Sequence, residues 1–149
     1  MPADLDLVRR LGASEHGLVV VTTTRPDGTV HASVVNAGLL DDPVGGEPAV
    51  ALVARSDASK LRHFRRSGAR ACVVFRSGWE WAAVEGPVRV IGPDDPAPGF
   101  DADGVRLLLR NVFVAAGGSH DDWDEYDRVM AEERRTAVFV APARITGNG

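Results

Sequence analysis

A tight turn between two β-branched segments constrains the fold of this chain more than any other feature. The segment Leu18–Thr24 consists largely of valine and threonine, which are typical of β-strands. It runs into the turn Arg25–Gly28, in which Pro26 presets one backbone angle and Gly28 permits a positive φ. The returning strand, residues 29–40, is therefore expected to lie antiparallel to the first. Strands joined this closely do not fit a doubly wound parallel sheet, which needs crossover helices.

The rest of the chain continues with strand and helix patterns. Further strands are predicted at residues 49–54, 70–76 and 79–91, and the chain closes with strand segments 136–140 and 144–146. Helices are predicted at residues 5–11, 59–67 and 105–114, and from near 119–122 to a last turn at Arg134 and Arg135. The expected fold class is mainly β with accessory helices, an antiparallel barrel of about six strands.

Length and composition exclude several classes of protein. The 149 residues predict one domain, residues 1–149, and a net charge of −4 argues against a nucleic-acid partner. No stretch reaches the apolar length of a membrane span, and the N-terminus lacks the basic start of a signal peptide, so we expect a cytoplasmic protein without a membrane partner. A single cysteine, Cys72, rules out a disulfide within the chain.

The only lysine marks a candidate anion site. Lys60 stands at the predicted start of a helix, whereas the other 16 basic residues are arginines. Helix N-termini present unpaired N–H groups, and serine hydroxyls and an ammonium group add donors for a phosphate. The neighbouring candidates are Arg55, Ser56 and Ser59. The alternative is an ordinary solvated lysine on a surface helix.

Other residues carry weaker signals. Trp79 and Trp81 are two apart, so on a strand they would face the same side and could wall a planar ring, or serve as core or dimer contacts. His31 is interpreted as a hydrogen-bonded structural histidine. No cluster has the spacing of metal ligands, and no serine lies in a Gly-x-Ser-x-Gly elbow, so neither a metal site nor a catalytic residue is predicted.

Three segments together resemble the pyridoxamine 5′-phosphate oxidase-like superfamily of split-barrel flavoproteins. They are the hairpin Leu18–Asn36 with its Arg-Pro-Asp-Gly turn, the serine-x-lysine-type segment Ser56–Arg62, and the strand Trp81–Val88 with its Val-Glu-Gly sequence. Within the superfamily, the chain is most similar to the actinobacterial branch that uses the deazaflavin coenzyme F420. The resemblance implies a split β-barrel that forms a homodimer and transfers a hydride between F420 and an unsaturated small molecule.

The resemblance also implies roles for the candidate residues. Ser33, Val34, Val35 and Asn36 would face the ring of the cofactor, and Arg55, Ser56, Ser59 and Lys60 would hold its phosphate. Trp79, Trp81 and a second subunit would complete the substrate pocket. The chain departs from the oxidases in carrying Trp81 where they tend to have a glutamine, and Arg144 is the only basic candidate near the C-terminus for binding pyridoxal phosphate.

Two alternative functions stay open at this point. One is an FMN-dependent oxidase or reductase with the same fold. The other is a non-catalytic protein that binds the cofactor, or haem, without turnover. The lack of an obvious acid, base or nucleophile fits a cofactor enzyme, because the cofactor carries the chemistry.

Overall fold

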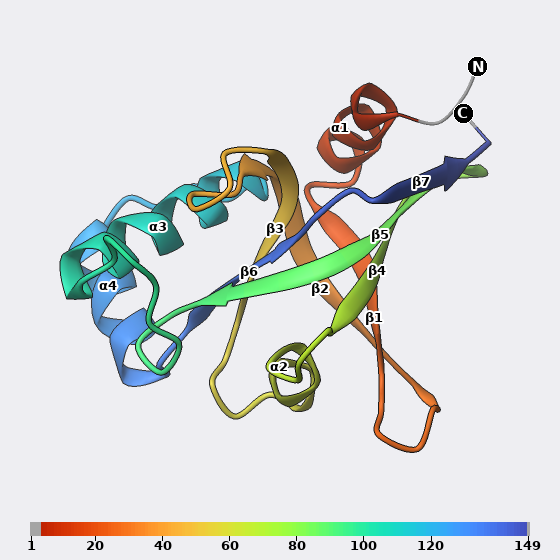
Figure 1. The fold of residues 1–149 in the computed structure, drawn as a ribbon. Helices are drawn as coiled ribbons and strands as arrows, with labels where there is room; N and C mark the ends of the chain where they lie inside the picture. Colours follow the sequence, from red (N-terminus) through yellow and green to blue (C-terminus); the bar gives the residue numbers. More distant parts are fainter. Residues whose placement is uncertain (1–3, 149) are drawn as a thin grey trace.

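The structure, a computed structural model, describes residues 4–148, so residues 1–3 and 149 of the predicted domain lie outside the described residues. Seven strands and four helices follow one another along this part of the chain (Figure 1). Their order is α1 (Leu5–Ser14), β1 (Leu18–Thr24), β2 (Val30–Asp41), β3 (Pro48–Ala54), α2 (Ser59–Phe64), β4 (Arg70–Ser77), β5 (Glu80–Ile91), α3 (Ala102–Ala115), α4 (Trp123–Glu132), β6 (Thr136–Val140) and β7 (Arg144–Gly147).

Six of the strands close into an antiparallel barrel. The order is β4-β1-β2-β3-β6-β5, and β5 also pairs with β4, so that every strand of the ring has two neighbours. β7 is added to β5 beyond the end of β6, where the chain passes through Ala141–Ala143. Closure pairs most of the strand edges that would otherwise be open to another chain. The predicted barrel is confirmed, with β7 as an additional strand.

Strand β2 changes its pairing partner halfway along its length. Residues 30–36 pair with β1, whereas residues 37–41 pair with β3 on the other edge. Within the described part of the chain, no strand pairs with the β3-facing edge of residues 30–36. Because half of the backbone N–H and C=O groups of a strand point to each edge, this edge offers hydrogen-bonding groups to something other than a strand.

Two hydrophobic clusters hold the barrel and its helices together. The first fills the barrel and includes Phe75 and Val73, with Leu11 of α1 and Leu61 of α2 packed against it. The second lies between the outside of the barrel and α3, where Val112 and Leu109 pack with residues such as Phe139. Figure 1 accordingly shows α1 and α2 at opposite ends of the barrel, and α3 and α4 together on one side. None of the helices among residues 4–148 is long and apolar enough to cross a membrane.

Several predicted boundaries were wrong, each for a local reason. Helix α2 ends at Phe64, not Ser67, because the chain turns through Gly68, whose φ is +71°. Arg134 and Arg135 lie beyond α4 and not in its last turn, since Arg134 takes a positive φ of 49°. Trp79 belongs to the turn between β4 and β5, because Ser77 pairs directly with Glu80. It therefore does not share a strand face with Trp81.

A substitution at Gly86 tests the close approach of β5 to the chain segment that follows β6. A Cβ at this position of β5 would lie 1.9 Å from the carbonyl oxygen of Ala141, at the break between β6 and β7. We therefore expect Gly86→Ala to lower the free energy of unfolding by about 1–3 kcal/mol, because the backbone must shift. Gly45→Ala is the control, since its Cβ would meet Asp42 Cγ only at 3.9 Å. Urea unfolding of the three proteins measures the effect; equal stability would contradict this close approach.

Candidate functional site

Three side chains of β2 face the barrel side beside its unpaired edge. Ser33 lies opposite Val21 and His31 opposite Thr23 in the pairing with β1, and Val35 follows on the same face. All three are half-buried, whereas the alternate residues Ala32 and Val34 are exposed. Ser33 Oγ and His31 Nδ1 are buried and have no hydrogen-bond partner among the described residues. Such atoms cost about 1–3 kcal/mol each when unsatisfied, so a ligand that pairs with them is favoured.

Helix α2 brings a second histidine to this face. The fully buried Leu61 and nearly buried Phe64 anchor the helix in the core, and they turn His63 toward β1 and β2. His63 Nδ1 shares a hydrogen bond of 2.7 Å with Thr23 Oγ1, and its ring centroid lies 5.5 Å from that of His31. Burial lowers the pKa of His63, and His31 and the arginines around it lower it further. The imidazole is therefore neutral near pH 7.

Lys60 is a cation without a partner in the structure. It is half-buried at the start of α2 and makes no hydrogen bond or ion pair with any residue from 4 to 148. Burial lowers its pKa, and the charge of Arg135 lowers it further. A half-buried ammonium group beside a second cation is an unfavourable arrangement that an anion would relieve.

The sequence did not single out Arg135 as a site residue. It directly precedes β6, whose first residue, Thr136, pairs with Ala54 at the end of β3, and this pairing brings it to the start of α2. Its Nη2 donates to Glu133 at 2.9 Å, but its Nε is buried without a partner among the described residues. Its position next to Lys60 depends on the fold of the C-terminal third of the chain, so no local signal could reveal it.

A cleft of about 310 Å³ continues from these residues between the barrel and helices α3 and α4. Its walls are mostly apolar and include Val35, Val53, Phe113, Tyr126 and Met130, with Asn36 and Arg135 as polar members. Burial raises the pKa of Tyr126 to about 12, and its hydroxyl donates to the carbonyl of Leu109 at 3.1 Å. Tyr126 is therefore a neutral wall of the cleft and not an acid.

We define the edge groove as this cleft together with the adjoining surface at Lys60, His63, His31 and Ser33, on α2 and β2. Lys60 and His63 stand three apart on α2, His63 contacts His31, and Ser33 and Val35 follow along β2 to the cleft. Arg135 lines the cleft, and its charge reaches Lys60 and lowers the pKa of that ammonium group. The groove thus has a cationic end at Lys60, buried polar atoms without partners beneath its middle and an apolar end at the cleft. These features suit an elongated anion with a flat apolar part.

The other predicted phosphate residues are engaged with the protein itself, Ser56 and Arg55 with acidic residues and Ser59 with Arg62. Ser56 Oγ donates to Asp94 at 2.9 Å, and Arg55 Nε lies 3.3 Å from Asp57 and 3.8 Å from Glu133. Ser59 Oγ accepts a long contact of 3.4 Å from Arg62. Of these predicted residues, Lys60 alone is unpaired within the described chain.

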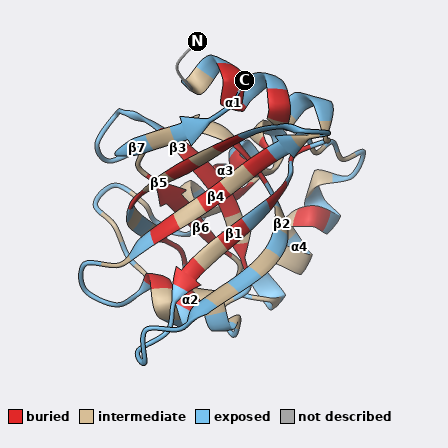
Figure 2. Ribbon diagram, turned by 90° about the vertical axis from the view of Figure 1, so that its right-hand side faces the viewer, coloured by how far each residue is buried: buried red, intermediate tan, exposed pale blue. Residues whose placement is uncertain are grey.

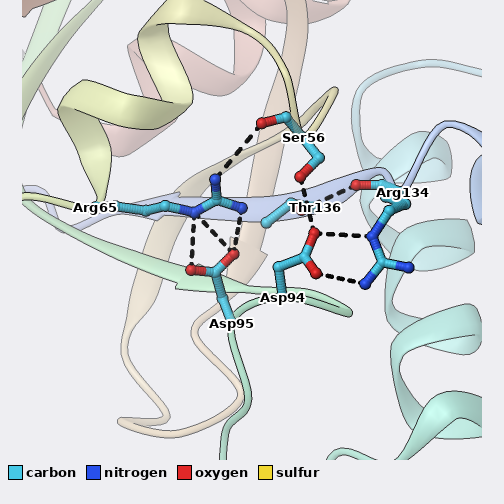
Figure 3. Close-up of polar contacts among 6 residues, drawn as sticks. All are labelled: Ser56, Arg65, Asp94, Asp95, Arg134 and Thr136. Carbon is cyan, nitrogen blue, oxygen red and sulfur yellow. Dashed lines mark hydrogen bonds and ion pairs between the residues drawn. The ribbon is translucent and has the colours of Figure 1, made fainter.

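Figure 3 shows the ionic cluster that holds Ser56. Asp94 also accepts from Arg134, and Asp95 accepts from Arg65 Nε at 2.9 Å. Arg65 Nη1 reaches back to the carbonyl of Ser56 at 3.5 Å. The cluster connects the loop before α2, the loop after β5 and the residues before β6, so it fixes the cationic end of the edge groove.

The two tryptophans lie away from the edge groove of their own chain. Trp81 pairs with Arg76 at the beginning of β5, whereas the other end of β5 reaches β6 beside the start of α2. Trp79 is 94% exposed in the turn and Trp81 is 37% exposed. Their assignment to a ligand pocket is therefore not met within one protomer, and it stays a proposal that involves a second one.

An apolar surface covers the outer side of the sheet. Register places Val34, Val20, Val74 and Ala83 in one row across β2, β1, β4 and β5. Val34 is 67% exposed and Val20 39%, and Leu18 and Val30 extend the surface. We call these residues the outer sheet face. Figure 2 shows that no helix covers β1, β4 and β5 on this side, and exposed apolar surfaces of this kind mark interfaces.

No protein-family model matches the chain. Among solved structures, it is similar to the conserved hypothetical protein Rv2991 from Mycobacterium tuberculosis, with a TM-score of 0.69, 16% identity, and coverage of 99% of this chain and 84% of that one. A pyridoxamine 5′-phosphate oxidase-related, FMN-binding protein from Nostoc punctiforme gives a TM-score of 0.60 at 14% identity, with coverage of 96% and 81%. A protein described as an F420 reductase gives 0.58 at 14% identity, with coverage of 87% and 88%.

These similarities confirm the fold that the sequence resemblance implied. The chain has the split-barrel fold of the pyridoxamine 5′-phosphate oxidase-like proteins, and its structural neighbours include FMN- and F420-related members.

The ionic cluster predicts a specific loss of stability in acid. Arg134 and Ser56 lower the pKa of Asp94 from its ordinary 3.8 to about 2, so its stabilising effect is complete above pH 3.8 and is lost as the pH falls toward 2. The difference in unfolding free energy between wild type and Asp94→Asn should therefore be constant near neutrality and decrease below pH 3.8, with most of it lost by pH 2, where the carboxyl of the folded protein is half protonated. Urea unfolding across this range measures it. Asp103→Asn, an exposed change on α3, is the control and should cost less than about 0.5 kcal/mol. A difference for Asp94→Asn that does not vary with pH would contradict the assignment.

Proposed function

We propose that the edge groove binds a phosphorylated flavin-type cofactor and that the protein is an oxidoreductase. F420 is the favoured cofactor and FMN the alternative. The observation that carries the proposal is Lys60, a half-buried cation whose side chain has no partner among residues 4–148 and whose pKa is lowered by burial and by the charge of Arg135. The neighbours described as an F420 reductase and an FMN-binding protein support it.

The residues of the groove fit such a cofactor in three parts. Lys60, with the hydroxyl of Ser59, would hold the phosphate, and the anion would offset the unfavourable charge pair of Lys60 and Arg135. The unpaired edge of β2 at Ser33–Asn36 would supply hydrogen bonds to the polar rim of the ring. Val35 and Val53 provide an apolar wall for its face. Arg55 and Ser56 would join the phosphate site if they released their own carboxylate partners.

When bound, the cofactor supplies the hydride chemistry, and the protein provides binding, orientation and exclusion of water. His63, whose pKa burial lowers, and the adjacent ring of His31 support the middle of the groove, and Tyr126 stays protonated. No side chain of the groove is assigned as the acid or base of the reaction. The substrate proposed is an unsaturated small molecule, and the cytoplasmic location stays a prediction.

We also propose that the outer sheet face joins two copies of the chain. The face carries an apolar row across four strands that is exposed on β1 and β2 and partly exposed on β4 and β5, and dimer formation would remove it from water. Trp81 lies on this side of the sheet beside Arg76, and the exposed Trp79 adjoins it. In a dimer, both tryptophans would be available to the groove of the partner, which is the role that the resemblance gives them.

Titration with F420 and, separately, with FMN tests the cofactor site. Fluorescence quenching gives a dissociation constant for each, and we expect tighter binding of F420. Lys60→Ala should weaken binding by roughly ten- to a hundredfold, because it removes a charge-assisted contact with the phosphate. Arg9→Ala, which removes an exposed charge on α1, is the control and should leave both constants unchanged.

Two results would overturn parts of this assignment. Unchanged affinity in Lys60→Ala would remove the phosphate from the edge groove. Preference for FMN would replace F420 by the flavin, and binding of neither would reject the oxidoreductase proposal.

The proposed dimer interface leads to a separate prediction. Val20→Glu places a charge in the centre of the outer sheet face and should convert a dimer to a monomer in sedimentation velocity, with unchanged circular dichroism. Val114→Glu is matched, because Val114 is an equally apolar residue, 54% exposed, on α3 away from this face. That variant should stay dimeric. A monomeric wild type, or a dimeric Val20→Glu variant, would show that the outer sheet face is not the interface.

A further inference from the structure

A second cavity shares Arg135 and Met130 with the cleft of the edge groove. It has a volume of about 530 Å³, is open to solvent, and is lined by the loop after β5, by α3 and by the last turns of α4. Its walls are mainly apolar and include Pro93, Pro96, Phe100, Val105, Leu109 and Met130. The volume falls in the range of small-molecule sites, about 300–1,000 Å³.

The charged groups at the rim of this cavity are already paired. Arg106 lies 3.4 Å from both Asp103 and Asp127, and Arg110 Nε donates to Asp127 at 2.9 Å. Arg134 is held by Asp94, as Figure 3 shows. The Asp101 side chain accepts the N–H of Gly104 at 2.8 Å and so caps α3. Because these charges neutralise one another, a charged ligand would gain no ion pair in the cavity, and an uncharged ligand is favoured.

Arg135 lines both the cavity and the edge groove, and Met130 is the other residue shared by the two walls. Of the guanidinium nitrogens of Arg135, only Nη2 donates to a residue between 4 and 148, namely Glu133 at 2.9 Å. A guanidinium with unpaired donors favours a ligand that brings an acceptor to it.

We propose that this cavity binds a small, uncharged, largely apolar molecule with one hydrogen-bond acceptor, such as a ketone, whose oxygen accepts from the guanidinium of Arg135. Its apolar body packs against the side chains that line the loop, α3 and α4. Since Arg135 and Met130 form a common wall, the ligand lies next to the edge groove. If the proposed function holds, this molecule would be the electron acceptor of the reaction. That role rests on the proposed function, whereas binding of the molecule to the cavity does not.

The test uses the whole chain without any cofactor. 4-Phenylbutan-2-one serves as the probe, because it has an apolar ring, one carbonyl and no reducible double bond next to the carbonyl. Titration followed by ¹H–¹⁵N correlation spectra of the labelled protein gives both the dissociation constant and the location of the site. We expect saturable shifts of backbone amides within residues 100–106 and 130–135, and none on the outer sheet face.

Two variants and a control identify the contacts. Arg135→Lys keeps the charge but removes the planar guanidinium donors, and it should weaken binding about tenfold. Ala131→Leu fills the cavity from an exposed position of α4 and should weaken binding severalfold. Glu132→Leu adds the same side chain at the next residue of α4, which does not line the cavity, and should leave the affinity within about twofold.

Absence of saturable binding to wild type would overturn the proposal, as would shifts that map elsewhere. Unchanged affinity in both Arg135→Lys and Ala131→Leu would also overturn it, and because Ala131 is exposed, that variant keeps the test valid if Arg135→Lys fails to fold. The cofactor titration is a separate experiment. If cofactor binds and the ketone does not, only the second ligand site is rejected; if the ketone binds and no cofactor does, only the oxidoreductase assignment is rejected.

Discussion

The change of pairing partner halfway along β2 is the constraint on which the rest of the structure depends. The strand pairs with β1 up to Asn36 and with β3 from Ala37 onward, so the barrel closes while one edge of residues 30–36 stays unpaired. Backbone groups at such an edge need other partners. The alternation of side chains also gives this strand two faces: His31, Ser33 and Val35 lie on the groove side, whereas Val34 belongs to the outer sheet face. One strand thereby contributes both to the proposed cofactor site and to the proposed dimer interface.

The edge groove is stabilised by its surroundings and not by its own contacts. Ser33 Oγ, His31 Nδ1 and Arg135 Nε are buried without partners in the described chain, and Lys60 is a half-buried charge next to another cation. Each of these features opposes folding. The two hydrophobic clusters and the ionic cluster around Asp94 hold the groove in place despite this cost. Unfavourable polar arrangements of this kind are typical of ligand sites, where the ligand completes the hydrogen bonds.

The fold was largely predictable because its signals are local. The β1–β2 turn, the β-branched strands and the helix starts follow from short patterns, and the antiparallel barrel follows from their order. Local patterns predicted the wrong strand boundary at Trp79. This residue lies in the turn between β4 and β5, because Ser77 pairs directly with Glu80. The site was only partly predictable. Lys60 is prominent in the sequence as the only lysine, but Arg135 reaches it through the pairing of β6 with β3, and the engagement of Ser56 by Asp94 joins residues 38 apart. Such long-range contacts produce no local pattern in the sequence from which they could be predicted.

The central claim is that the unpaired edge of β2 and the start of α2 together receive the cofactor. Backbone hydrogen exchange, measured residue by residue with and without saturating F420 and repeated with FMN, tests it most directly, because it reports the amides that a ligand protects and not merely that one binds. The account predicts slower exchange for amides within residues 31–36 and 59–63 when cofactor is present. Protection confined to other segments, with unchanged exchange at residues 31–36, would contradict it.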